Sequence, residues 1–201
     1  MTPSTKHKFN LPIFRNFFLR NFLSKSFLII TAIIIYCCSI FSSSHSQADE
    51  NIVKAVFFER FSRFIEWKKV SNNDEFKIII IGSDIRMLNH LKKVYGNHTI
   101  KDKSVVIQHI ENVSDLKKTD CDILFISENM SKNLDQIIEY SSQKSILTIA
   151  DSKNFAKRGV MINFFLKDSS VQFKINQEAA KKANIFISYH LLKMAEVVEG
   201  S

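Results

Sequence analysis

The stretch "FKIIIIGSD", Phe76–Asp84, decides the fold class of this 201-residue chain. It is a continuous apolar run that ends at a glycine, a pattern typical of a strand buried on both faces of a sheet. The helical pattern "IRMLNHLKKVY" follows at once, and Ser83 or Asp84 supplies its N-cap. A buried strand that leads directly into a helix predicts a parallel sheet covered by helices.

The same alternation continues along the chain. Further strands are predicted at "SVVIQHI" (104–110), "CDILFIS" (121–127) and "SILTIAD" (145–151), and the helical patterns "SDLKK" and "SKNLDQIIEYSS" lie between them. Then "VMINFFL" and "VQFKI" flank the turn at residues 167–170, and the second run alternates apolar with polar residues. That alternation predicts an antiparallel hairpin at an edge of the sheet.

The C-terminal part is predicted to be helical. Asn176 is placed to cap the helix "QEAAKKA", and a last helix is expected near Ser188–Glu199. The expected fold is therefore a three-layer α/β domain with a mostly parallel central sheet, an antiparallel edge hairpin and helices on both faces.

The N-terminus has the features of an export signal. Residues 1–26 contain five basic residues and no acidic one, the uncharged run "FLIITAIIIYCCSIF" (27–41) follows, and "SSSHSQADE" is small and polar. This order predicts a signal peptide over residues 1–48, cleaved between Ala48 and Asp49. An uncleaved membrane anchor is the alternative, although the apolar run is shorter than the roughly 20 residues that a span needs. Residues 49–201 then form a single domain.

Charge and cysteine content exclude several functions. Five of the 28 basic residues and none of the 20 acidic residues precede Asp49, so the remainder has 23 basic and 20 acidic residues, a net charge of +3. Without a basic block, we expect no nucleic-acid partner. Cys121 is the one cysteine outside the predicted signal, so no internal disulfide forms there, and a buried, inert thiol is expected rather than a redox sensor or an intermolecular bridge.

The opening helix, predicted over "KAVFFERFSRFIEW" (Lys54–Trp67), is unusually apolar. Its apolar residues fill an arc of about 200°, whereas one core face needs little more than about 100°. Either the helix is wedged between the sheet and a neighbouring helix, or its edge residues, Phe58 and Trp67 first, pack on a second subunit or a partner. The candidate contact residues on this helix are Phe57, Phe58, Phe61, Phe64 and Trp67.

Two further positions are candidate sites. Gly82, Ser83 and Asp84 lie where a strand gives way to a helix, where backbone N–H groups bind anions in other proteins, but no G-x-G-x-x-G or P-loop motif accompanies them. Arg158 is a partner contact or an ion pair with Asp151, and the adjacent Gly159 is expected to have a positive φ.

Catalytic and metal-binding motifs are missing from the sequence. No G-x-S-x-G, H-E-x-x-H or Cys/His signature occurs, and no histidines have metal-ligand spacing. We therefore expect no enzyme activity, no cofactor and no metal site.

The order of the motifs resembles the YfiR family. It runs through "KAVFFERFSRFIEW", "FKIIIIGSD", "CDILFIS", "ILTIADSKNFAKRGVMINF", "VQFKIN" with "AAKKANIFIS", and "LLKMA", from about Asn51 to Val198. Three features differ from the family pattern: a single glycine at Gly159-Val160 where two are frequent, Lys68 where proline is usual, and Cys121 without the partner that a disulfide-regulated member would have.

The resemblance implies a compact, often dimeric α/β protein of the bacterial periplasm. It implies a regulator that restrains an inner-membrane diguanylate cyclase, or a similar sensor, by binding its periplasmic part and so limits cyclic di-GMP and biofilm formation. A homodimer is expected on the same ground. The alternative is a periplasmic ligand-binding accessory of a transporter or a sensor kinase that uses the crevice at Gly82–Asp84.

Overall fold

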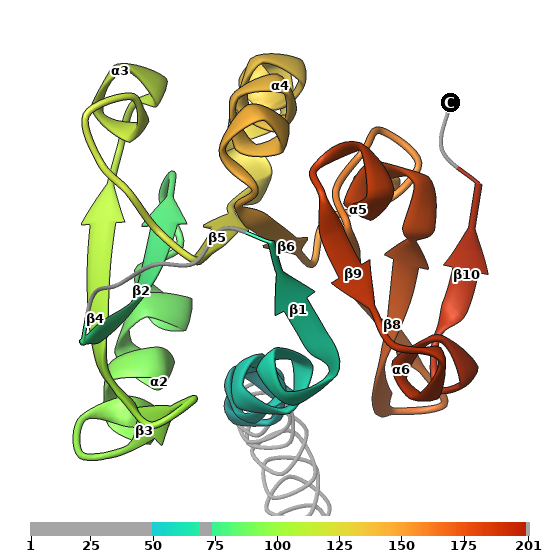
Figure 1. Ribbon diagram of the computed structural model, residues 1–201, viewed down its shortest axis with the longest axis horizontal. Coiled ribbons are helices and arrows are strands. Elements are labelled where there is room, and N and C mark those ends of the chain that lie inside the picture. Colours follow the sequence, from blue (N-terminus) through green and yellow to red (C-terminus); the bar gives the residue numbers. More distant parts are fainter. Residues whose placement is uncertain (1–49, 69–73, 200–201) are drawn as a thin grey trace, which may run out of the picture. The chain divides into compact units, whose positions relative to one another are not determined.

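The computed structural model describes residues 50–68 and 74–199 (Figure 1). The predicted signal peptide and its cleavage site at Ala48 and Asp49 lie outside the described residues. Within the described ranges, no helix is long and apolar enough to cross a membrane.

The centre of the fold is an eight-stranded sheet in the order β10-β8-β7-β6-β5-β2-β4-β3. Its strands β4, β2, β5, β6 and β7 run parallel to their neighbours, whereas β3 and β8 are antiparallel to β4 and β7. The strands are β2 (Glu75–Ile81), β3 (Thr99–Ile100), β4 (Lys103–Ile110), β5 (Ile123–Ile126), β6 (Leu147–Ala150), β7 (Ile162–Lys167), β8 (Ser170–Asn176) and β10 (Glu196–Val198). The predicted sheet, mostly parallel with an antiparallel hairpin, is confirmed.

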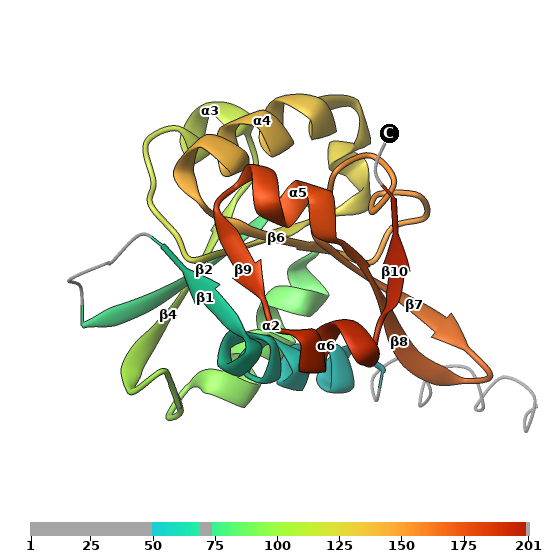
Figure 2. The same ribbon diagram turned by 45° about the vertical axis from the view of Figure 1, so that its right-hand side comes forward.

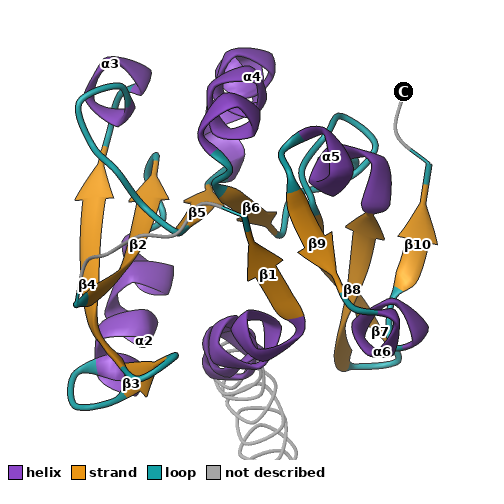
Figure 3. Ribbon diagram, in the orientation of Figure 1, coloured by secondary structure: helices purple, strands orange, loops and turns teal. Residues whose placement is uncertain are grey.

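Helices cover both faces of this sheet (Figures 1 to 3). Successive residues of β2 belong to different cores, because strand side chains alternate between the faces. Ile78 and Ile80 pack with α2 (Ile85–Tyr95) and the opening helix, which is helical over residues 50–64. Ile79 and Ile81 pack with α3 (Val113–Leu116), η1 (Glu128–Asn133) and α4 (Leu134–Lys144). The three-layer prediction is confirmed.

The opening helix is shorter than predicted. It ends at residue 64, and Ile65–Trp67 forms strand β1, which pairs antiparallel with β9 (Ile185–Ile187) in a separate two-stranded sheet. Ser188 N–H donates to the carbonyl of Phe64, the last helical residue, at 2.9 Å. This hydrogen bond holds the end of the helix next to the end of β9. The helical pattern in the sequence continues to Trp67. Residues 65–67 nevertheless form a strand, because they pair with a strand far along the chain.

The C-terminal region also differs from the prediction. The expected helix over Ser188–Glu199 is a short α6 (Tyr189–Lys193) followed by β10, which pairs parallel with β8. The β7–β8 hairpin is therefore not the sheet edge, because β10 covers it. The turn of that hairpin is two residues long, Asp168 and Ser169, both with positive φ. α5 (Gln177–Lys182) follows β8, capped by the Asn176 side chain as predicted.

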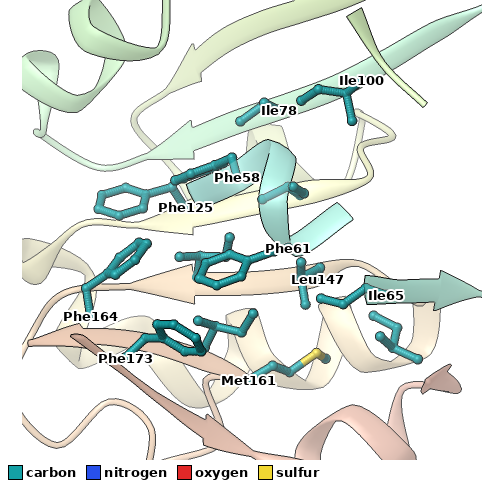
Figure 4. Close-up of a cluster of buried hydrophobic side chains, with 14 of the residues drawn as sticks. Phe58, Phe61, Ile65, Ile78, Ile100, Phe125, Leu147, Met161, Phe164 and Phe173 are labelled. Atoms are coloured by element: carbon teal, nitrogen blue, oxygen red, sulfur yellow. The ribbon is translucent and has the colours of Figure 1, made fainter. Parts of the chain in front are cut away.

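An aromatic cluster fastens the opening helix to the sheet (Figure 4). Phe61 is fully buried, with its ring centroid 5.6 Å from that of Phe164 on β7 and 5.0 Å from that of Phe173 on β8. Phe58 is also fully buried and lies 6.3 Å from Phe125 on β5. Rings at these separations gain attraction beyond the burial of their area, so the first helix is part of the core.

Tyr95, at the end of α2, joins the two helices that cover this face. Its hydroxyl donates to the Ala55 carbonyl at 2.8 Å and accepts from Glu59 N–H at 3.0 Å, so one side chain contacts both ends of an i, i+4 pair in the opening helix. Burial raises the pKa of Tyr95 to about 12, above the usual value of 10.0.

Gly82, the residue after β2, has a backbone conformation that other residues rarely adopt. Its φ is +104°, and a Cβ built on it would lie 2.4 Å from Asn129 Oδ1 and 2.8 Å from Ser127 Cβ. Gly159 has the positive φ that the sequence predicted, +103°. Position 82, between β2 and α2, therefore requires a glycine, because no side chain fits there.

We predict that Gly82→Ala lowers the free energy of unfolding by about 2–4 kcal/mol, because strain at positive φ adds to steric overlap. Urea unfolding of the purified protein measures this. Gly96→Ala is the matched control, since Gly96 has a φ of −55° that alanine adopts readily, and it should cost less than about 1 kcal/mol. Equal losses in the two variants would contradict the strain.

We predict that Tyr95→Phe flattens the alkaline part of the stability profile. The folded pKa of Tyr95 is raised, so its contribution is fully present below pH 10 and is lost as the pH rises from 10 to about 12. Thermal unfolding between pH 8 and about 12 should show a smaller fall for the variant, together with a lower midpoint at pH 8. Tyr189→Phe removes an exposed hydroxyl and should leave the pH 8 midpoint unchanged.

Candidate functional site

The structure separates the candidate contact residues of the opening helix into two groups. Phe58 and Phe61 are fully buried, whereas Phe57 and Phe64 are partly buried and pack against the same core. The expectation that Phe58 lies at an accessible edge is therefore wrong, because its ring packs on Phe125 of the sheet. The exposed apolar side chains of this helix are Val53 and Val56, 42% and 38% exposed, which face away from the sheet.

Trp67 is held by its own chain. It lies on β1, and its ring meets Phe76 edge to face at 5.9 Å. The Lys101 ammonium lies 5.0 Å from the ring centroid and donates to the Ile65 carbonyl at 2.9 Å. Burial lowers the pKa of Lys101, and the nearby Glu66 opposes that shift. Most of the Trp67 side chain is therefore buried against its own domain. Contact of Trp67 with another protein stays a prediction.

Arg158 forms its ion pair with Asp135 and not with Asp151. Its guanidinium lies 3.1 Å from Asp135 Oδ1 and donates to the hydroxyl and the carbonyl of Ser131, both at 3.0 Å. The alternative of a pair with Asp151 is wrong, because Asp151 instead accepts from Lys54. These contacts tie the loop before β7 to the start of α4, and a partner contact by Arg158 stays a prediction.

The turn at Gly82–Asp84 is closed by the neighbouring strand end. The sheet order changes direction between β2 and β5, the position at which ligands bind in many open α/β sheets. Here Ser83 N–H donates to Asn129 Oδ1 at 3.0 Å, and Asp84 N–H donates to Ser127 Oγ at 3.2 Å. Gly82 N–H donates to the carbonyl of Ile110, so the amides expected to bind an anion are already engaged.

Asp84 has the capping role that the sequence predicted. Its Oδ1 accepts from Met87 N–H at 2.9 Å, which satisfies one of the free donors at the start of α2. The turn is therefore explained by structural roles, and it offers no support for a ligand crevice at these three residues.

A different set of polar residues lies at the carboxyl end of β6, and the sequence analysis missed it as a site. Lys54 of the opening helix lies 2.8 Å from Asp151 Oδ2 and 2.5 Å from Glu50 Oε1, with only 7% of its side chain exposed. Burial acts to lower the pKa of Lys54, but the two carboxylates raise it above the usual value. These three residues form one wall of a hollow of about 450 Å³.

The other residues that line this hollow come from later segments. Asn163, Phe165 and Leu166 of β7 and Lys153 of the loop after β6 also line the hollow. One feature of the sequence indicated the position of this hollow. Asp151 directly follows a buried strand, at the end where parallel sheets bind ligands. The contribution of Lys54 could not be inferred, because it comes from nearly 100 residues earlier in the chain.

The largest exposed apolar side chains lie near the C-terminus. Within residues 186–197 the structure exposes Phe186 (59%), Tyr189 (66%), Met194 (59%) and Val197 (51%), on the consecutive elements β9, α6 and β10. We name these four residues the C-terminal apolar segment. Tyr189, Met194 and Val197 lie within the range of the helix expected near Ser188–Glu199, whereas Phe186 precedes it; the strands β9 and β10 were not predicted.

The described residues include no cluster of three or more His, Cys, Asp or Glu side chains that could hold a metal ion. Cys121 is buried and forms no disulfide.

Three solved structures match part of this chain at low identity. A conserved domain protein from Vibrio cholerae matches with a TM-score of 0.48 and 12% identity, over 60% of this chain and 54% of that chain. An ABC domain in complex with L-Trp from Streptococcus pneumonia matches with 0.45 and 9%, over 61% and 55%. A ligand-free, open substrate-binding protein with adhesive properties from Clostridium difficile matches with 0.47 and 11%, over 63% and 55%. The chain thus spans little more than half the length of each.

No curated protein matches the sequence. The model of the YfiR/HmsC-like family matches residues 51–196, from the first turns of the opening helix to the start of β10. The match covers most of the chain and nearly all of the domain that the structure describes. This chain belongs to the YfiR/HmsC-like family.

Proposed function

We propose that this protein is a periplasmic regulator that restrains a membrane diguanylate cyclase by binding the periplasmic part of that enzyme. Family membership over residues 51–196 is the observation that carries the proposal, because the YfiR-like family is periplasmic and regulatory rather than catalytic. The described residues fit a binding role, since their polar clusters are engaged in ion pairs, helix caps and turns.

The C-terminal apolar segment is the surface that best fits this partner. Exposed large apolar side chains gathered on one part of a soluble protein mark protein–protein contacts, and aromatic residues are enriched there. Phe186 and Tyr189 supply two such rings, each more than half exposed. Phe58 and Phe61, two of the candidate contact residues from the sequence, are excluded from this role by their burial.

The expected homodimer remains a prediction, and the same surface could serve it. Sedimentation of the purified protein distinguishes the two uses. If the surface binds only the cyclase, the oligomeric state does not depend on Phe186 and Tyr189. The alternative of a ligand-binding accessory at Gly82–Asp84 is not supported, because the backbone donors of that turn are engaged.

We predict that the double substitution Phe186→Thr and Tyr189→Asp abolishes the restraint. In a deletion strain of the source bacterium, cyclic di-GMP should rise severalfold, wild-type protein should restore the low level, and the double variant should fail to do so. Threonine preserves strand propensity at Phe186, and aspartate suits the first turn of α6 at Tyr189. Stability should change by less than about 1 kcal/mol.

Ile85→Asp is the matched control. Ile85 is 47% exposed at the first residue of α2, so the variant also exchanges an exposed apolar residue for an acid at a helix start. It should restore the low level of cyclic di-GMP. The proposal fails if deletion leaves cyclic di-GMP unchanged in a strain that has a membrane cyclase. The assignment of the surface fails if the double variant restores the low level as well as the control does.

A further inference from the structure

We infer that the protein docks on a bilayer surface of anionic phospholipids through the three helices that cover one face of its sheet. These are the opening helix, α2 and α6, which lie on the same side of the sheet in both views (Figures 1 and 2). Their buried residues belong to one core. We name these three helices the basic layer.

Positive charge is concentrated in the basic layer. Its helices contain seven basic and two acidic residues, a net charge of +5, whereas the whole chain from Asp49 onward has a net charge of only +3. The helices that pack on the other face, α3, η1 and α4, contain two basic and four acidic residues. The domain is therefore electrostatically polar, with its basic side on one face of the sheet.

Most of this positive charge is uncompensated. The two acidic residues of the layer are already engaged, because Glu50 contacts Lys54 and Glu59 contacts Arg63. Two of the remaining cations contact aromatic rings, which do not neutralise a charge. The cations that are exposed and form no ion pair within the described residues are Arg60, Arg86, Lys92, Lys93 and Lys193.

Exposed apolar residues lie beside these cations on the opening helix. At 3.6 residues per turn, Val53, Val56, Arg60 and Arg63 lie within an arc of about 80° on the outer side of the helix. Val53 and Val56 are 42% and 38% exposed. Protein helices that lie on bilayers combine basic residues, which meet the lipid phosphates, with apolar residues that enter the headgroup region. A bilayer surface therefore satisfies both kinds of residue in this layer.

The sequence also brings the basic layer close to a membrane. The uncharged run at residues 27–41 has the composition of a segment that enters the bilayer during export. Only eight residues, 42–49, separate it from the first residue of the opening helix. Eight residues span at most about 28 Å, so this helix begins within reach of the lipid surface.

Cosedimentation with lipid vesicles tests the inference. The protein is produced with its own presequence, purified after export and mixed with vesicles of phosphatidylglycerol and phosphatidylcholine in equal parts, in about 0.1 M NaCl. Five cations near an anionic surface should give a molar partition coefficient on the order of 10³ M⁻¹. Vesicles of phosphatidylcholine alone should bind at least about tenfold less, and about 0.5 M NaCl should release the protein.

Two results would overturn the inference. Equal binding to both kinds of vesicle would show that the charges of the basic layer do not select the lipid. No binding at about 5 mM anionic lipid would exclude the bilayer, with an acidic protein as the alternative occupant of the layer.

Charge reversal localises the contact. Lys92→Glu together with Lys93→Glu should weaken binding to the anionic vesicles at least about tenfold, because two cations become anions. Lys132→Glu with Lys144→Glu is the matched control, since it changes the net charge equally and also in the last turns of helices, but on the other face of the sheet. The control should stay within about threefold, because salt screens charges over about 10 Å. Equal losses in the two double variants would contradict the assignment of the face.

An environment-sensitive fluorophore gives a second readout. Attached to the thiol of a Val56→Cys variant, it should brighten and shift to shorter wavelength on addition of anionic vesicles, because residue 56 enters the headgroup region. The same label on a Lys132→Cys variant should not respond. Cys121 is buried and therefore does not compete for the label. A response at position 132 and none at position 56 would overturn the inference.

The inference is independent of the proposed partner. Vesicle binding uses the purified protein and lipid alone, whereas the regulatory role is tested by cyclic di-GMP in cells. Failure of one experiment therefore leaves the other interpretable.

Discussion

The packing of Phe61 against Phe164 and Phe173 is the contact on which the rest of the domain depends. These three rings come from the first helix and from two strands more than 100 residues later, so the contact closes the chain on itself. Burial of three aromatic side chains is among the largest single contributions that a domain of this size can have. A second long-range contact lies next to it, because β1, which directly follows the opening helix, pairs with β9.

The sequence was sufficient for the six inner strands of the central sheet and insufficient for its two edge strands and for the ends of the domain. Strands such as Ile78–Ile81 are apolar on both faces, and the glycine and aspartate after them mark the turn and the helix cap, so the local signal and the fold agree. The strands β1, β9 and β10 are three residues long and exist only through their partners. No periodicity develops over three residues, so the expected helices extended through β1 and β10, and β9 was not predicted.

For the candidate site too, local features could be predicted from the sequence, whereas contacts between distant segments could not. An arc of about 200° correctly indicated that the opening helix has more apolar surface than one face requires. It could not indicate that both sides of the helix are covered, by Phe125 on one side and by the β7–β8 hairpin on the other. Phe186 and Tyr189 are instead the exposed aromatic residues, and a polar hollow forms at Lys54, where segments distant in sequence meet. The wedge hypothesis for the helix therefore holds for Phe58 and Phe61.

The central claim is that the opening helix belongs to the core, whereas the C-terminal apolar segment meets the partner. Photo-crosslinking in cells tests it most directly, with a photoreactive amino acid placed at Tyr189 or at Val53, both exposed in the structure. The account predicts that position 189 captures an inner-membrane protein whose peptides, identified by mass spectrometry, include a diguanylate cyclase domain, and that position 53 does not. Capture of that protein from position 53 and not from position 189 would contradict the account.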